Sequence, residues 1–128
     1  MAYEHPLKAK PTATNLLAAQ ELSRPVVTAM MTEISIASKP LLDVVQTSGA
    51  VSPTTLVAAV VAWIKAGPRI AAAAIAVLGV AVLGGEAVTT TARLIGMRPA
   101  TLGERLRTTW AGARGSELIR DGDTWAVK

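Results

Sequence analysis

Hydrophobic residues recur at three- and four-residue intervals through residues 15–50, which is the spacing of one face of an α-helix. Thr14 precedes the first such run and is expected to cap it, since a threonine oxygen can accept a bond from a free amide at a helix start. Pro25 is expected to end this helix and begin the next, and Pro40 to kink or restart that one. Residues 15–50 are therefore predicted to form amphipathic helices, preceded by an extended polar arm over residues 1–14.

A different pattern begins at Ser52 and Pro53, which together make a typical helix start: a hydroxyl that accepts an amide bond, then a proline suited to the first turn. In the run that follows, apolar residues surround the whole helix circumference, as in a helix buried on all sides. A second apolar run comes next, in which Glu86 is the only acidic residue. The two runs, at about 53–66 and 69–92, are expected to be the arms of a central helical hairpin.

Between the two runs lies a sequence with the features of a tight turn. Glycine readily adopts the left-handed conformation that follows a helix end, and proline begins a helix more easily than it continues one. The predicted turn of the hairpin consists of Lys65, Gly67, Pro68 and Arg69. The second arm is long enough to cross a bilayer, which needs about 20 apolar residues. Residues 53–95 are therefore predicted to be a membrane or assembly core.

Small residues are frequent in the second arm. Ala72, Ala76 and Gly79 fall on one stripe at spacings of four and three, which permits the close approach of a neighbouring helix. This stripe is predicted to pack copies of the chain together; the alternative is that alanine and valine simply fill a helix. Glu86, near the end of the arm, is expected either to handle ions or protons as an intramembrane polar group, or to reach water or pair with a base such as Arg93.

After Gly96 the chain becomes more polar, and residues 99–128 are predicted to form a basic helix followed by a β-hairpin. Thr101 and Glu104 have capping-box spacing for that helix, which is expected to continue to Gly112. Its apolar side is formed by Leu102, Leu106 and Trp110. The helix is expected either to dock on the hairpin as a solvated helix or to lie on a membrane surface, with the tryptophan at headgroup depth.

The C-terminal stretch alternates apolar and polar residues on both sides of Asp121 and Gly122, which is a strong signal for a two-residue hairpin turn. Two pairs would then face each other across the strands: Leu118 with Trp125, and Arg120 with Asp123. The predicted fold class is accordingly all-α, with a central helical hairpin, flanking amphipathic helices and a short C-terminal β-hairpin.

The composition favours close helix packing. Apolar residues make up 51% of the chain and charged residues 17%, so the chain is more hydrophobic than an ordinary soluble domain. Aromatic residues are only 3% and phenylalanine is absent, which leaves alanine, valine, leucine and isoleucine as the packing residues. Such a chain is expected to bury surface against lipid or other copies. The N-terminal sequence has no apolar core of a signal peptide, so a cleaved secretory signal is not expected.

Most of the net charge of +4 comes from the C-terminal part of the chain, where basic residues outnumber acidic ones. The candidates for contact with anionic lipid or with phosphate are Arg93, Arg98, Arg105, Arg107 and Arg114. Charge alone does not choose between a lipid surface, nucleic acid and an acidic protein. If the chain is in a membrane, the positive-inside tendency predicts that this basic end lies on the cytoplasmic side.

Catalytic and metal-binding patterns are not found in the sequence. The single histidine, His5, lies in the polar arm, and cysteine is absent, so a zinc site is not expected. The carboxylates are scattered over separate elements, and no phosphate-binding glycine loop or nucleophile motif is present. We therefore expect neither enzymatic activity nor a cofactor.

The apolar hairpin and the basic end predict a non-enzymatic, self-assembling structural protein that is embedded in a membrane. Two short apolar helices joined by a basic turn resemble, in pattern only, conjugative pilins and small phage holins, with Lys65 and Arg69 at the turn. The expected partners are copies of the chain and the lipid bilayer. Two alternatives stay open: an accessory subunit that binds other membrane subunits, and a basic helical coat protein that packages nucleic acid in a viral or filamentous assembly.

Overall fold

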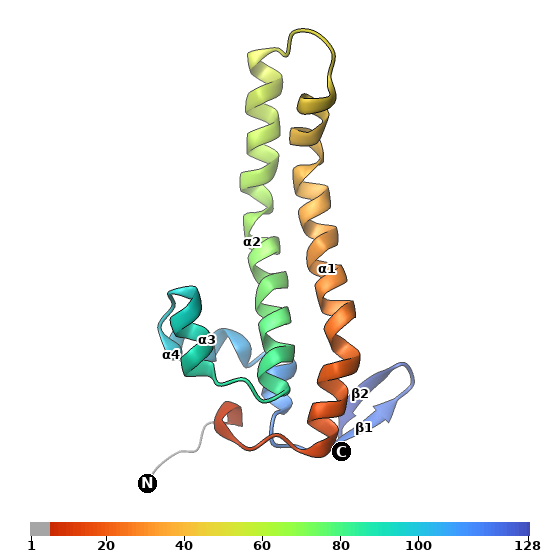
Figure 1. The fold of residues 1–128 in the computed structure, drawn as a ribbon, viewed down its shortest axis with the longest axis vertical. Helices are drawn as coiled ribbons and strands as arrows, with labels where there is room; N and C mark the ends of the chain where they lie inside the picture. The colour runs from red at the N-terminus through yellow and green to blue at the C-terminus, as the bar shows by residue number, and fades with distance from the viewer. Residues whose placement is uncertain (1–5) are drawn as a thin grey trace. The chain divides into compact units, whose positions relative to one another are not determined.

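The computed structural model describes residues 6–128, and His5, with the first part of the predicted arm, lies outside the described residues. The helices are α1 (Ala13–Gln46), α2 (Pro53–Leu83), α3 (Val88–Ile95) and α4 (Pro99–Leu106), with 3-10 turns η1 (Pro6–Lys8) and η2 (Trp110–Ala113) and strands β1 (Leu118–Asp121) and β2 (Thr124–Val127) (Figure 1). The predicted class, mostly helical with a C-terminal β-hairpin, is confirmed. By its internal contacts the chain divides into two compact units: a first that joins the chain up to Val26 with Ile75–Lys128, and a second, Val27–Ala74.

The start of α1 is fixed by Thr12, two residues before the predicted cap at Thr14. The Asn15 amide donates to Oγ1 of Thr12 at 3.1 Å, and the Thr12 amide donates to Oδ1 of Asn15 at 3.0 Å. This reciprocal pair satisfies free amides at the helix start in the manner of a capping box. Thr14 has a different role, since its Oγ1 accepts a bond from the Leu118 amide at 2.8 Å.

The predicted helix end at Pro25 and the predicted restart at Pro40 are wrong, because both prolines lie inside the continuous helix α1. A proline inside a helix removes one backbone donor and costs about 3 kcal/mol. The packed side of α1 nevertheless continues across the first proline, since Leu22 and Val26 pack against the same cluster of buried residues. Continuous packing of one helix face can outweigh such a local cost.

The predicted turn at Lys65, Gly67, Pro68 and Arg69 is also wrong, because α2 continues through Pro68. Gly67 is not among the glycines with positive φ, so it does not end a helix. Because it has no Cβ, Gly67 avoids part of the clash that a proline imposes on the residue before it, which lets the helix pass. The resemblance to pilins and holins required a turn here, so the continuous helix removes the basis of that resemblance.

The chain reverses between α1 and α2 instead. Gly49, with φ 84°, lies in this connection. Ser52 Oγ accepts a bond from the Thr55 amide at 3.1 Å, and Pro53 is the first residue of α2, so the predicted start signal is confirmed. The helical hairpin therefore exists, but its arms within the second unit belong to α1 and α2 (Figure 1).

Small residues form the contact between these two arms of the second unit. Ala37 of α1 and Ala59 and Ala66 of α2 are almost fully buried. The half-buried residues of α2 that complete this line are Ala62, Ile70 and Ala73. The line recurs at three- and four-residue spacing, as expected for one helix stripe, and its short side chains permit close backbone approach.

In the first unit, α2 ends at Leu83 and a separate helix, α3, begins at Val88, so the predicted arm at 69–92 is divided. Gly85 has φ 114°, a conformation that other residues rarely adopt and that stops the helix. The predicted helix from Thr101 to Gly112 is divided as well. The observed helix α4 begins with Pro99 and ends at Leu106, and no side chain caps its start.

The β-hairpin is present but with a different register. The observed pairs are Leu118 with Val127, Ile119 with Ala126, Arg120 with Trp125 and Asp121 with Thr124. The turn residues are therefore Gly122 and Asp123, not Asp121 and Gly122 as predicted. A turn centred on Asp121 and Gly122 would favour positive φ at Asp121, whereas the observed turn requires it only at Gly122, where φ is 62°.

Two clusters of buried residues hold the first unit together. One contains Leu7, Val82, Ala92, Leu102, Leu106 and Ala111. The other contains Ala18, Ala19, Val80, Leu83, Leu118 and Trp125. The last turns of α2 contribute to both clusters, so this end of α2 is the common support for α3, α4 and the β-hairpin.

Candidate functional site

In the second unit, α2 has an exposed apolar side. Leu56, Val60 and Trp63 recur at spacings of four and three and are all exposed. Val57 and Ile64 extend this stripe and are more exposed still. The α1 arm of the same unit has exposed apolar residues of its own, namely Val27, Met31, Ile36, Leu42 and Val45. The second unit therefore leaves much of its large apolar surface uncovered.

A second exposed stripe of α2 is charged. Ala58, Lys65, Arg69 and Ala72 recur at spacings of seven, four and three, which places them on one side of the helix. Arg69 Nε lies 3.7 Å from Oε2 of Glu33 on α1. Among the described residues, no carboxylate lies within ion-pair distance of Lys65. The arm of α2 in this unit thus has three sides: a buried alanine line, an exposed apolar stripe and a charged stripe.

The predicted packing stripe of small residues is divided by the fold. Ala72 is exposed and belongs to the charged stripe, and Ala76 is half-buried. Gly79 is buried in the first unit, where a Cβ would lie 2.2 Å from Oγ1 of Thr109. Gly79 therefore serves a contact within the chain, and packing between copies stays a prediction for the other two residues.

The five predicted anion-contact arginines fall into two groups. Arg93, Arg98 and Arg105 are exposed, and among the residues that the structure describes none of them has a carboxylate within ion-pair distance. Arg107 is engaged by Glu104, with Nη1 3.4 Å from Oε2. Three of the five guanidinium groups are thus available to an external anion.

Arg114 is held by the backbone of the first unit. Its Nε donates to the Ala9 carbonyl at 2.7 Å, and its Nη1 donates to the carbonyls of Val82 at 3.2 Å and Glu86 at 2.7 Å. Burial lowers the pKa of this guanidinium below its ordinary value. Arg114 therefore neutralises carbonyls at the end of α2, where a cation also interacts favourably with the helix dipole. The Glu86 side chain is exposed beyond the end of α2.

Glu21 of α1 binds the β-hairpin, a contact that the sequence did not predict. One of its oxygens accepts a bond from Arg120 Nη2, and the other accepts a bond from Trp125 Nε1 at 3.0 Å. The Arg120 guanidinium also lies over the Trp125 ring, 4.7 Å from its centroid. The bond from Arg120 is the main reason that the pKa of Glu21 is lowered. Nothing in the local sequence around Glu21 indicates these partners.

Asn15 provides a second polar connection of the first unit. It is fully buried, and its Oδ1 accepts a bond from the Gly115 amide at 2.8 Å. Its Nδ2 donates to the Ser116 carbonyl at 2.8 Å. The spacing of Thr12 and Asn15 is the only sequence signal for this role, and it indicates the helix start but not the distant partners.

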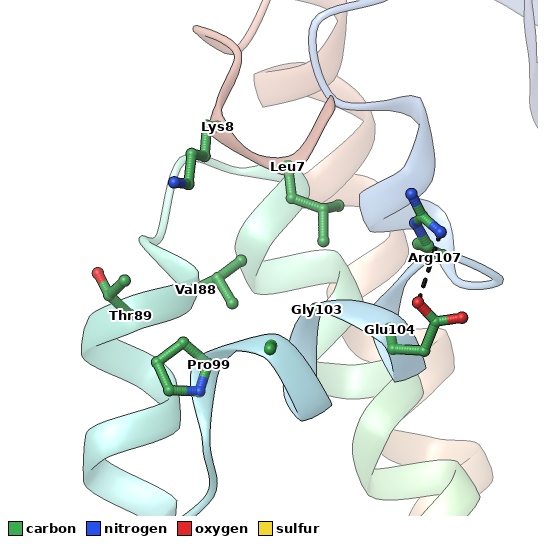
Figure 2. A pocket seen from close by; sticks show the side chains of 9 residues that line it. Leu7, Lys8, Val88, Thr89, Pro99, Gly103, Glu104 and Arg107 are labelled. Atoms are coloured by element: carbon green, nitrogen blue, oxygen red, sulfur yellow. Dashed lines mark hydrogen bonds and ion pairs between the residues drawn. The ribbon is translucent and has the colours of Figure 1, made fainter. Parts of the chain in front are cut away.

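A groove of about 470 Å³ lies in the first unit between η1, α3 and α4. Figure 2 shows Leu7 and Val88 on one side of it and Pro99 and Gly103 on the other. Its charged lining residues are Lys8, Glu104 and Arg107. The last two are paired with each other, and the lining residues include no histidine, cysteine or serine. The groove therefore offers an apolar surface whose polar lining consists of the Thr89 hydroxyl, the Lys8 ammonium and the Glu104–Arg107 ion pair.

In residues 6–128, no group of three or more histidine, cysteine, aspartate or glutamate side chains lies close enough together to hold a metal ion. Comparison with known protein families, with curated proteins and with solved structures finds no match to this chain. Within the described part of the chain, one helix, α2, is long and apolar enough by length and composition to cross a membrane.

Proposed function

We propose that this chain is a non-enzymatic structural protein that is embedded in a membrane through its second unit and assembles with copies of itself. The supporting observation is the surface of α2. The whole helix, which continues into the first unit, contains an 18-residue window with a mean hydropathy of 1.9, of which 28% is buried within the chain. In its second-unit part α2 buries only Ala59 and Ala66, whereas Leu56, Val60 and Trp63 are exposed. The core helix of a soluble protein has comparable hydropathy but is mostly covered by its own chain.

The length of α2 is compatible with this proposal. The part of α2 in the second unit, residues 53–74, extends about 33 Å, which is enough to cross the hydrocarbon core of a bilayer, about 30 Å thick. The apolar stripe with Leu56, Val60 and Trp63 faces the hydrocarbon in this arrangement. Its residues then become covered by lipid, which removes the exposed apolar area that water disfavours.

The charged stripe supplies the argument for assembly. Lys65 and Arg69 lie near the middle of α2, and an ionised side chain in hydrocarbon costs several kcal/mol unless it faces other protein or water. Arg69 has Glu33 as a partner, but Lys65 needs water or a group from another molecule. A neighbouring copy packed along this stripe, against Ala58 and Ala72, shields it from lipid.

The orientation follows from the first unit. Its exposed arginines favour the side of the membrane that retains positive charge, so the first unit lies on the cytoplasmic side. A protease added outside intact cells is expected to leave the Arg105 region uncut. Cutting there from outside would contradict this orientation.

Cysteine cross-linking tests the proposal directly, because the native chain contains no cysteine. Ala72→Cys places a thiol on the charged stripe, and Val60→Cys is the matched variant on the apolar stripe. After treatment of isolated membranes with a short bis-maleimide, we expect the Ala72→Cys chain to form dimers and higher species on a gel, and the Val60→Cys chain to stay monomeric.

Two results would contradict the proposal. If the purified chain is monomeric and monodisperse in buffer without detergent, it is not a membrane assembly. If alkaline carbonate releases the chain completely from membranes, it does not cross the bilayer. Cross-linking of Val60→Cys in place of Ala72→Cys would show that copies meet through the apolar stripe.

A further inference from the structure

The pair of helices α3 and α4 has the dimensions of a helix-turn-helix. Each helix has eight residues, and the connection between them contains Gly96, Met97 and Arg98. In Figure 2, α4 leads off to one side of α3 and does not fold back along it. In such a motif two short helices are joined by a three- or four-residue turn, often with glycine, and the second helix is presented to the major groove of DNA.

The turn between these helices is well defined by backbone bonds. Gly96 has φ 72°, and its amide donates to the Arg93 carbonyl at 3.3 Å. The Met97 amide donates to the Ala92 carbonyl at 2.9 Å. These two bonds form a Schellman motif, in which the residue after the glycine turns back toward the helix. Ala92 and Met97 accordingly pack in the same cluster of the first unit.

Packing also determines which side of α4 is free. Leu102 and Leu106 are fully buried in that cluster. Arg98, Thr101 and Arg105 follow each other at spacings of three and four and are all exposed. The outward stripe therefore presents two guanidinium groups with a hydroxyl between them: Arg98 at the N-cap of α4, and Thr101 and Arg105 within the helix. The exposed Glu104 carboxylate also lies on the free side of α4, where it is paired with Arg107. Arg93 adds a third exposed guanidinium at the end of α3.

The β-hairpin does not extend this positive surface. Its turn lies between Asp121 and Thr124 and includes Asp123, so carboxylates would meet any phosphate there. Arg120 is already bonded to Glu21. The surface suited to a polyanion is thus confined to the outward stripe of α4 and the end of α3.

We propose that this surface binds double-stranded DNA, with α4 lying in the major groove and Arg93, Arg98 and Arg105 contacting phosphates. The proposal goes beyond membrane assembly and does not depend on it. The observations favour a duplex over a lipid surface because the three guanidinium groups lie on a helix-turn-helix. Leu94, 79% exposed at the end of α3, is the feature that a lipid surface would use instead.

The test is the salt dependence of DNA affinity, measured by fluorescence anisotropy with the full chain in uncharged detergent. Each phosphate contact contributes about 0.9 to the slope of log affinity against log salt. The Arg98→Gln/Arg105→Gln variant is expected to bind at least about tenfold more weakly near 0.1 M salt, with a slope smaller by about 1.8. Arg24→Gln, which removes an exposed charge from α1, is the control and should bind as the native chain does.

Three outcomes would overturn the proposal. The first is the absence of duplex binding at low salt. The second is an equal loss of DNA affinity in the double variant and in Arg24→Gln. The third is binding to anionic vesicles that depends on both Leu94 and these arginines, while DNA is not bound. None of these outcomes touches the membrane proposal, which depends on carbonate extraction and on cross-linking at Ala72. Failure of that proposal would in turn leave the DNA measurements unaffected.

Discussion

Glu21 shows how one side chain connects distant parts of the first unit. It accepts bonds from Arg120 and from Trp125, both on the β-hairpin. A two-stranded hairpin is only marginally stable by itself, so its position depends on such docking contacts. The burial of Leu118 and of the Trp125 ring supplies the apolar part of this contact, and the Glu21 carboxylate supplies the polar part.

We predict that docking of the β-hairpin weakens in acid. The folded-state pKa of Glu21 lies below its ordinary value, mainly because of the bond from Arg120. A group with a lowered folded pKa stabilises the fold above its unfolded pKa, and this contribution is lost as the pH falls through the folded pKa. The indole N–H resonance of Trp125 should therefore shift on acidification below the usual pKa range of glutamate.

Glu21→Gln is the control for this prediction. Glutamine keeps an acceptor for the indole but has no charge to titrate, so the acid shift of the Trp125 resonance should disappear. An unchanged acid transition in Glu21→Gln would assign it to another carboxylate.

At the scale of elements, α2 is an exception to the rule that a proline ends a helix. Pro68 lies inside this helix, where it leaves the Ile64 carbonyl without its usual helical donor. We predict that Pro68→Ala stabilises the helix, by up to about 3 kcal/mol, because alanine restores that donor and has the highest helix propensity. Thermal unfolding in detergent micelles, followed by circular dichroism, measures the change.

Pro53→Ala is the matched control, because Pro53 occupies the first turn of α2, where its missing N–H has no helical acceptor. That substitution should change stability by less than about 1 kcal/mol. If Pro68→Ala lowers the stability of the chain, Pro68 is needed for a bend or turn, and the continuous helix is contradicted.

The different outcomes at Pro53 and Pro68 explain how much of the fold was predictable. Ser52 and Pro53 were identified correctly, because a cap and a first-turn proline act locally. Gly67 and Pro68 carry similar local signals, yet the alanine line that includes Ala66 and Ile70 continues through them. Packing between distant segments decided the outcome there, and it is not visible in the sequence around the proline.

The candidate surface was also predictable only in part, because contacts between distant segments decide which residues are free. The high apolar content predicted an uncovered surface, and the structure locates it on α2 and α1 of the second unit. The basic end was also evident, but whether a given arginine is free depends on its neighbours in space. Arg114 is bonded to three carbonyls from two separate segments, whereas Arg105 has no such contacts among the described residues.

At the scale of the whole molecule, the two units differ in what covers their apolar residues. The first unit buries large apolar side chains in two clusters and pairs the buried polar groups of Asn15. The second unit buries mainly alanine and leaves its larger apolar residues exposed. If the second unit alone meets the hydrocarbon, lipid should contact its residues and not those of the first unit.

The three tryptophans make this difference measurable, because Trp63 belongs to the second unit and Trp110 and Trp125 to the first. We predict that lipids brominated on their acyl chains quench Trp63 fluorescence in reconstituted vesicles, since that indole lies on the exposed apolar stripe. Trp110→Phe/Trp125→Phe isolates this signal, and Trp63→Phe/Trp110→Phe isolates the control indole, which is bonded to Glu21 and buried within its own unit. Equal quenching of both variants would mean that the first unit also enters the hydrocarbon, and quenching of the control alone would reverse the assignment.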